Sequence, residues 1–124
     1  MAALNKNKLF GFLYHPGSQQ ILLQQKINEE PKNWELLEDL SKFVSKGILP
    51  VYDYVAKGKK CVVSYAEVKT AKHFSDGKTT VYKWFTAKEI SKLPLLPQTK
   101  QDLIVGRRVI DSQIRKDAGR QTIG

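Results

Sequence analysis

The chain has very little cysteine and histidine, and this scarcity excludes two common ways of bracing a small domain. Cys61 is the only cysteine, and His15 and His73 are the only histidines, among the 124 residues. One thiol cannot form an internal disulfide, and such cysteine usage is typical of proteins in a reducing cytoplasm. A zinc site of the usual cysteine and histidine ligands needs about four of them. The sequence therefore predicts a domain that depends on its hydrophobic core.

Long hydrophobic runs are also missing. No stretch approaches the roughly 20 apolar residues that a membrane-spanning helix needs. The first residues, MAALNKNKLFGF, lack an apolar segment followed by a small-residue cleavage site, which a secretion signal would have. We therefore expect a cytoplasmic protein with no membrane partner. With 41% hydrophobic residues, it should form a single domain over residues 1–124, in which residues 117–124 are a frayed tail.

Negative charge is scarce as well. The chain has 21 lysines and arginines against 12 aspartates and glutamates, which gives a formal net charge of +9. A field of this sign attracts polyanions, so nucleotides, RNA and acidic proteins are the candidate partners. The basic residues are spread along the chain rather than gathered in one tract, so a lysine-rich solubility surface is an equally valid interpretation. The oligomeric state stays open.

Three signatures of common enzyme classes do not occur. The chain has no GxSxG nucleophile elbow, no GxxxxGK[ST] phosphate loop and no GxGxxG dinucleotide fingerprint. The sequence therefore gives no support to a serine hydrolase, a P-loop nucleotidase or a Rossmann-type dehydrogenase.

Alternating hydrophobicity and turn residues predict several strands. The segment LFGFLY has aromatic residues at period two, and the turn His15-Pro16-Gly17-Ser18 follows it. A second hairpin is centred on Lys57-Gly58-Lys59. The expected strands are residues 9–14, 20–25, 48–55, 60–68 and 81–85, and residues 71–80 form a polar loop.

The segment 34–46 has the pattern of an amphipathic helix. Asn33 is placed to cap it, and Gly47 suits the left-handed position after its end. A competing interpretation ends a strand at Leu37 and begins the helix near Glu38. The apolar residues at helical spacing are Leu36, Leu37, Leu40, Phe43 and Val44.

Two further helices are expected in the last third. Thr86 and Glu89 have capping-box spacing, so a helical turn should begin there and stop at Pro94 and Pro97. A last helix should run from Thr99 to about Lys116. Strands mixed with two or three helices predict an α/β fold with a mixed, partly antiparallel sheet.

In order and spacing, several segments resemble the Nudix hydrolase family, and one bacterial subgroup of it in particular. These segments are LFGFLYHPGSQQILLQQ, NWELL, PVYDYVAKGKKCVVSYAEV and WFTAKEISKLPLLPQTKQDLIVGRRVIDS. The resemblance covers most of the chain. It implies a Nudix-like α/β/α sandwich and an ancestry among enzymes that cleave compounds linked to nucleoside diphosphates.

The catalytic part of that family's pattern is degenerate or deleted here. The family carries glycines and a glutamate-rich helix whose carboxylates hold Mg²⁺, in a box with Arg-Glu and Glu-Glu pairs before a closing glycine. Between Trp34 and Pro50 this chain has only ELLEDLSKFVSKGIL, and no Arg-Glu pair occurs anywhere. Gly47 matches the closing glycine, but Ser45 and Lys46 precede it, and an ammonium group repels a divalent cation. The resemblance therefore identifies no catalytic residue, and Mg²⁺ is expected as a cofactor only if the chain is an enzyme.

Other carboxylates offer an alternative metal site. Glu35, Glu38 and Asp39 are the only acidic concentration, and on a helix they would share a face able to hold Mg²⁺. A solvated helix face beside Lys42 is the competing interpretation.

Aromatic and basic residues suggest a nucleotide or phosphate site. Tyr52, Tyr54 and Trp84 are interleaved with lysines along the strands, and such aromatic rings can stack on bases. Arg107 and Arg108 could contact phosphate. Cross-strand packing of the aromatic rings and pairing of the arginines with the helix C-terminus are the competing interpretations.

Three functions remain in view. The first is a non-catalytic Nudix-like domain that binds a nucleotide or a protein partner. The second is a Mg²⁺-dependent hydrolase that uses the rearranged carboxylates, or whose glutamate box is omitted from the sequence. The third is a module that binds RNA or another polyanion. Whether the chain is an enzyme stays open.

Overall fold

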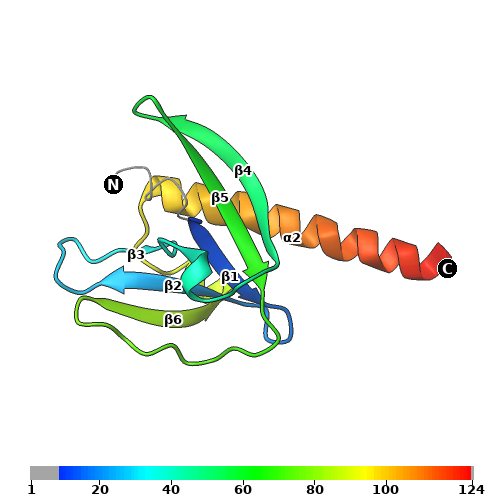
Figure 1. The fold of residues 1–124 in the computed structure, drawn as a ribbon, viewed down its shortest axis with the longest axis horizontal. Helices are drawn as coiled ribbons and strands as arrows, with labels where there is room; N and C mark the ends of the chain where they lie inside the picture. The colour runs from blue at the N-terminus through cyan, green and yellow to red at the C-terminus, as the bar shows by residue number, and fades with distance from the viewer. Residues whose placement is uncertain (1–8, 124) are drawn as a thin grey trace.

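A mixed sheet of six strands forms the centre of the molecule (Figure 1). The structure, a computed structural model, describes residues 9–123, with the side chains of residues 9–113. Its strands are β1 (Gly11–His15), β2 (Gln20–Lys26), β3 (Trp34–Glu35), β4 (Ile48–Ala56), β5 (Lys59–Glu67) and β6 (Thr80–Thr86). The hydrogen-bonded order is β3-β2-β1-β5-β4, and β6 pairs with β2. Strands β1 and β5 are parallel and the other pairs are antiparallel, which confirms the expected α/β class with a mixed sheet.

Strand β1 lies between β2 and β5, and its residues 12–14 are buried. At Gly11 the backbone of β5 comes so close that a Cβ atom would lie 1.7 Å from the Ser64 carbonyl oxygen. Only glycine fits there, because every other residue carries that atom. The predicted hairpin of β1 and β2 is confirmed. The N–H of Gln19 donates to the carbonyl of Pro16 at 3.3 Å and closes its turn.

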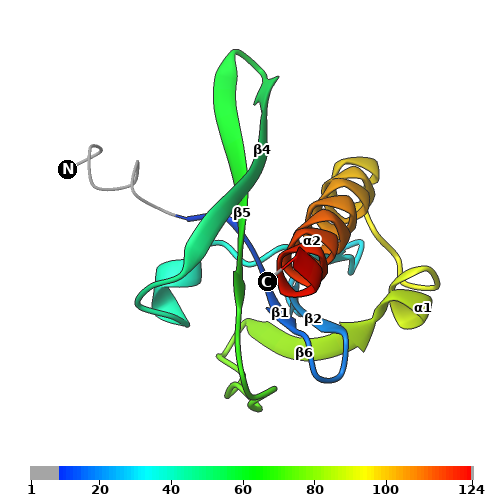
Figure 2. The ribbon, with the colours of Figure 1, turned by 90° about the vertical axis from the view of Figure 1, so that its right-hand side faces the viewer.

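The hairpin of β4 and β5 also follows the sequence. Lys57 and Gly58 both have positive φ, 53° and 75°, as the right-handed twist of a tight hairpin favours. This hairpin projects beyond the rest of the sheet in both ribbon views (Figures 1 and 2). Its tip is accordingly exposed, and Val55 retains 74% of its accessible surface.

The segment 34–46 does not form the amphipathic helix that its leucine spacing predicts. Trp34 and Glu35 form the short strand β3, and only Leu40–Lys42 is helical, as the 3-10 turn η2. The physical reason is non-local. Leu37 exchanges two backbone hydrogen bonds with Gly11, at 2.7 and 3.0 Å. If Leu37 were helical, the backbone N–H and C=O of Gly11 would both lose these partners. The competing interpretation, with a strand before Glu38, describes this segment better.

The last third of the chain holds both α-helices. The capping box of Thr86 and Glu89 is confirmed, and α1 (Ala87–Ile90) follows it. The second helix, α2 (Pro97–Ile123), begins earlier and ends later than expected. Pro97 opens this helix instead of stopping the previous one, because a proline at the first helical position has no N–H to satisfy. Among the described residues, no helix is long and apolar enough to cross a membrane.

The two faces of the sheet are covered differently. Helix α2 crosses one face (Figure 2), where Gly106 allows a close approach to Phe12: a Cβ atom would lie 2.6 Å from the Phe12 ring. The core on this side includes Tyr14, Val63 and Ile110. On the other face, η2 and the loop before β6 cover a second cluster of buried residues, formed by Leu13, Leu22, Leu37, Leu40 and Ala66.

Candidate functional site

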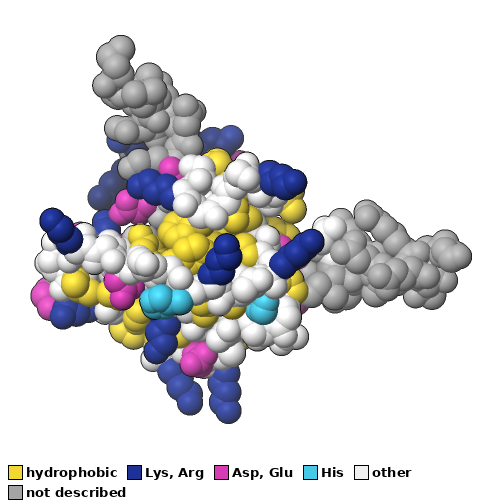
Figure 3. Space-filling view, turned by 60° about the horizontal axis from the view of Figure 1, so that its bottom comes forward, with side chains coloured by type: hydrophobic (Ala, Val, Ile, Leu, Met, Phe, Trp, Pro, Cys, Tyr) yellow, Lys and Arg dark blue, Asp and Glu magenta, His cyan; other side chains and the backbone are white. Residues whose placement is uncertain are grey.

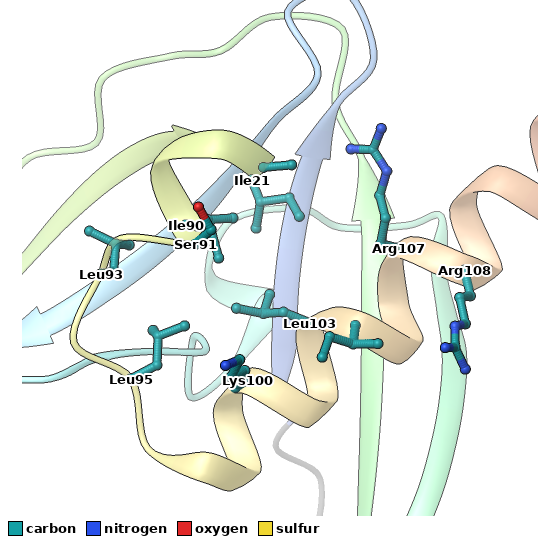
Figure 4. A pocket seen from close by; sticks show the side chains of 11 residues that line it. Ile21, Ile90, Ser91, Leu93, Leu95, Lys100, Leu103, Arg107 and Arg108 are labelled. Atoms are coloured by element: carbon teal, nitrogen blue, oxygen red, sulfur yellow. The ribbon is translucent and has the colours of Figure 1, made fainter.

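A cavity of about 490 Å³ lies beside α2, between that helix, β2, α1 and the segment that joins α1 to α2 (Figure 4). This volume is in the range of pockets that bind small molecules. Its lining is mainly aliphatic, with Ala87, Ser91 and three cations completing the wall. The larger aliphatic side chains are Ile21, Ile90, Leu93, Leu95, Leu103 and Ile104.

Hydrogen bonds that involve backbone groups hold the two walls opposite α2. The Glu89 carboxylate accepts the Thr86 N–H at 2.9 Å, and the Glu89 N–H donates to the Thr86 hydroxyl at 3.2 Å, so the start of α1 is capped from both sides. This capping lowers the pKa of Glu89, chiefly through the backbone N–H. The N–H of Trp34 donates to the carbonyl of Pro94 at 3.0 Å and ties the joining segment to the sheet beside Leu95. The walls are therefore built before any ligand arrives.

Three cations of α2 border the cavity: Lys100, Arg107 and Arg108. Lys100 and Arg107 are seven residues apart and thus stand about two helical turns apart on one face. Figure 4 shows Lys100 near Leu103, whereas Arg107 and Arg108 extend in different directions. No aspartate or glutamate of the described chain lines this cavity, so all of its charged lining residues are cations.

The cations differ in their engagement. The Nε of Arg107 lies 3.2 Å from a carboxylate oxygen of Asp111, one turn later, which neutralises part of its charge. Among the side chains of residues 9–113, no hydrogen bond or ion pair engages Lys100 or Arg108. These two are the cations that remain available to an anion.

A buried carboxylate fixes the position of α2 against β4. Asp102 is 1% exposed and accepts hydrogen bonds from the Tyr52 hydroxyl and, at 2.9 Å, from the Gln98 side-chain amide. Burial, followed by the hydrogen bond to Asp102, raises the pKa of Tyr52. The tyrosine therefore stays a donor across the physiological pH range. We call Tyr52, Gln98 and Asp102 the helix latch.

The predicted nucleotide-binding residues do not come together. Tyr52 belongs to the helix latch, and the neighbouring Tyr54 stands beside it with ring centroids 5.7 Å apart. Trp84 lies on the other face of the sheet, where its indole N–H donates to the carbonyl of Lys72 at 2.7 Å. Of the five, only the two arginines line the cavity beside α2. Tyr52 thus contacts α2 through Asp102 and Gln98, and both tyrosines pack at the edge of the hydrophobic core.

The three candidate carboxylates for a metal each contact a different group. Glu35 accepts a hydrogen bond from Gln24 at 2.9 Å, and Glu38 pairs with Lys26 at 2.8 Å. Hydrogen bonding to Glu38 raises the pKa of Lys26. Asp39 caps η2. Its pKa is lowered by the Ser41 hydroxyl, 2.7 Å away, and then by the Leu9 N–H.

These contacts decide whether the Mg²⁺ implied by the family resemblance fits. Mg²⁺ needs several oxygen ligands in near-octahedral array. Within residues 9–113, no three His, Cys, Asp or Glu side chains are grouped so that they could hold a metal ion. The residues of segment 35–39 thus do not provide the ligand set, and we derive no chemistry through this ion.

The surface charge shows no single basic tract on the face seen in Figure 3. Lysines and arginines stand apart from one another with acidic side chains among them, around a central group of hydrophobic side chains. This distribution agrees with the even spread of basic residues along the sequence.

The sequence reasoning missed Lys100 and every aliphatic residue of the lining. A signal was present, because Lys100, Leu103 and Arg107 follow one another at the three- and four-residue spacing of a single helix face. For the opposite wall, from Ile90 to Leu95, no sequence pattern indicated a place in a cavity.

Comparisons with protein-family models, with curated proteins and with solved structures found no match for this chain.

Proposed function

We propose that this protein is a Nudix-like domain that binds a small anionic ligand and does not hydrolyse it. The cavity beside α2 is the observation that carries the binding part. Three cations, Lys100, Arg107 and Arg108, stand at an aliphatic pocket without an acidic side chain in its described lining. The net charge of +9 adds long-range attraction for the same kind of ligand. A nucleotide is the ligand class that the family resemblance suggests, and the cysteine usage supports a cytoplasmic setting.

The proposal that the domain does not hydrolyse its ligand rests on the missing carboxylate ligands for Mg²⁺. The sequence lacks the family's Arg-Glu and Glu-Glu pairs, and Lys46 stands where a carboxylate is expected. The nearby Glu35, Glu38 and Asp39 bind an amide, an ammonium group and a 3-10 turn instead. Pyrophosphate hydrolysis in this family needs cations that neutralise charge on the phosphoryl oxygens. The domain therefore keeps the means to attract an anion without the groups to cleave it.

Calorimetric titration with nucleoside mono-, di- and triphosphates and with inorganic pyrophosphate tests the binding. The decisive variant is Lys100→Gln/Arg107→Gln/Arg108→Gln, and its control is Lys57→Gln/Lys59→Gln/Lys78→Gln, which removes equal charge from exposed turns away from the cavity. We expect the first to lower affinity for bound anions by roughly tenfold and the second to change it little. Equal losses in both variants would mean that net charge, not the cavity, binds the ligand.

Chromatography of the same nucleotides after incubation with Mg²⁺ or Mn²⁺ tests the absence of hydrolysis. We expect no turnover above the buffer. Turnover that EDTA abolishes, and that disappears in Glu35→Gln/Glu38→Gln/Asp39→Asn, would overturn the proposal in favour of the enzyme. Salt-dependent binding to an RNA oligonucleotide, unaffected by changes at the cavity, would favour the polyanion-binding alternative instead.

A further inference from the structure

The lining of the cavity beside α2 is poorly suited to a nucleobase. Bases are held by stacking on aromatic rings and by hydrogen bonds to their polar edges. No aromatic ring lines this cavity among the described residues. Within the described lining, Ser91 has the only side-chain hydroxyl, and that hydroxyl already donates to the carbonyl of Lys88 at 2.7 Å. A nucleotide would therefore find its phosphate partners here without a site for its base.

The same lining suits a flexible hydrocarbon chain. Six aliphatic side chains enclose the space from three sides, with Ile90 and Leu93 on one wall and Leu103 on another (Figure 4). Ile104, which belongs to the lining, leaves 42% of its surface exposed, and Leu96 beside the pocket leaves 51%. Exposed apolar surface that continues an apolar pocket is typical of ligand-binding grooves. A ligand with a hydrocarbon body would cover it.

We propose that the cavity beside α2 binds a single-chain aliphatic anion, a carboxylate or phosphate monoester whose chain enters the pocket while its head group meets Lys100. This inference rests on the proposed function, since it names the class of anion for the same site. Lys100 is the choice for the head group because it borders the pocket next to Leu103 and its ammonium group has no partner among the side chains of residues 9–113. Arg107 is a weaker choice, because it is paired with Asp111.

Titration of the full chain with straight-chain carboxylates, from hexanoate to tetradecanoate and kept below their micelle concentrations, tests the hydrocarbon part. We expect the affinity to rise by about fourfold for each added methylene until the pocket is filled, and then to level off. Alkyl phosphates of equal chain length should show the same slope. An affinity that does not depend on chain length would overturn the inference.

Two pairs of variants assign the binding to this cavity. Ile104→Glu places a carboxylate at the mouth and should remove most binding, whereas Val55→Glu makes the same change on the remote β4–β5 hairpin and should leave it intact. Both positions are exposed, so neither change disturbs the core. Lys100→Gln should weaken every anion by the same factor, up to about fivefold, while Lys100→Arg restores binding. Alkyl alcohols should be insensitive to both Lys100 variants.

The outcomes separate this inference from the proposed function. If nucleotides bind and lose affinity in the Lys100, Arg107 and Arg108 variant while carboxylates do not bind, the aliphatic ligand is wrong and the anion site stands. If neither class binds, both proposals fail. Sedimentation with vesicles of phosphatidylglycerol separates a free ligand from a lipid bilayer. Vesicle binding without any binding of free carboxylates would overturn the inference in favour of a membrane surface.

Discussion

Removal of one hydroxyl group, by Tyr52→Phe, tests how α2 is fixed to the sheet. In the helix latch, the buried carboxylate of Asp102 accepts hydrogen bonds from only Tyr52 and Gln98 among the described side chains. A hydrogen bond to a charged group contributes about 1.5–3 kcal/mol to stability. Tyr52 is partly exposed, and water can replace part of the lost bond, so we expect the free energy of unfolding to fall by about 1.5–2 kcal/mol.

Urea unfolding followed by circular dichroism measures this change, with Tyr82→Phe as the control. Tyr82 packs on Phe43 with ring centroids 5.4 Å apart, and no hydrogen bond engages its hydroxyl among the side chains of residues 9–113. Its substitution should alter stability by less than about 0.5 kcal/mol. A double-mutant cycle with Asp102→Leu should give a coupling energy of about 0.5–3 kcal/mol between Tyr52 and Asp102. A Tyr52→Phe protein as stable as the control, with no coupling, would refute the helix latch.

The same hydroxyl predicts a response to alkaline pH. Because burial and Asp102 raise the pKa of Tyr52 from its ordinary value of 10.0, the folded protein keeps this proton where the unfolded chain loses it. Its contribution to stability is complete below pH 10 and declines as the pH rises towards the folded pKa. Tyr52→Phe should therefore lose less stability than the wild type between neutral and strongly alkaline pH.

Three further variants test the fold. Gly11→Ala should unfold the domain or cost more than about 3 kcal/mol in urea unfolding, because its Cβ would overlap the backbone of Ser64 and neither strand can yield. Gly106→Ala should be destabilising despite a gain of about 1 kcal/mol in helix propensity, and Phe12→Leu added to it should recover part of the loss. Asp39→Asn should make stability less sensitive to acid. A carboxylate with a lowered pKa stabilises the fold above its unfolded pKa, and this stabilisation is lost as the pH falls. The free energy of unfolding measured at a series of acidic pH values would show the difference.

The strands were predictable because their signals are local. Period-two aromatics in residues 9–14 and the Lys57-Gly58 turn specify geometry within a few residues. The predicted helix over residues 34–46 was wrong because the leucines there fit both the spacing of a helix and burial in a strand. Leu36 and Leu37 are both buried as neighbours at the edge of the sheet, and only the distant Gly11 decides between sheet and helix. No local pattern contains that partner.

Of the candidate site, only two of the basic residues and none of the aliphatic lining were predicted from the sequence. Arg107 and Arg108 were candidate phosphate contacts because of their charge, with pairing to the helix C-terminus as the alternative, and both line the cavity. The tyrosines were assigned to the same site because aromatic rings near lysines can stack on bases. Such residues occur in hydrophobic cores as well as in binding surfaces, so the pattern does not separate the two roles. The role of Tyr52 depends on Asp102, which lies 50 residues away in sequence and meets it only when α2 crosses the sheet.

Helix α2 links the stability of the domain to its candidate site. Asp102 faces the sheet and Lys100 faces the cavity, while Leu103 contributes to both the core and the lining. The helix latch and the aliphatic wall are thus parts of the same helix, and a shift of α2 that broke the latch would also move Leu103 in the lining. An apolar ligand gains in proportion to the area it buries, so a small displacement of α2 would change which chains fit. The two hydrogen bonds to Asp102 are directional, so they restrain α2 to positions in which Tyr52 and Gln98 both reach the same carboxyl oxygen.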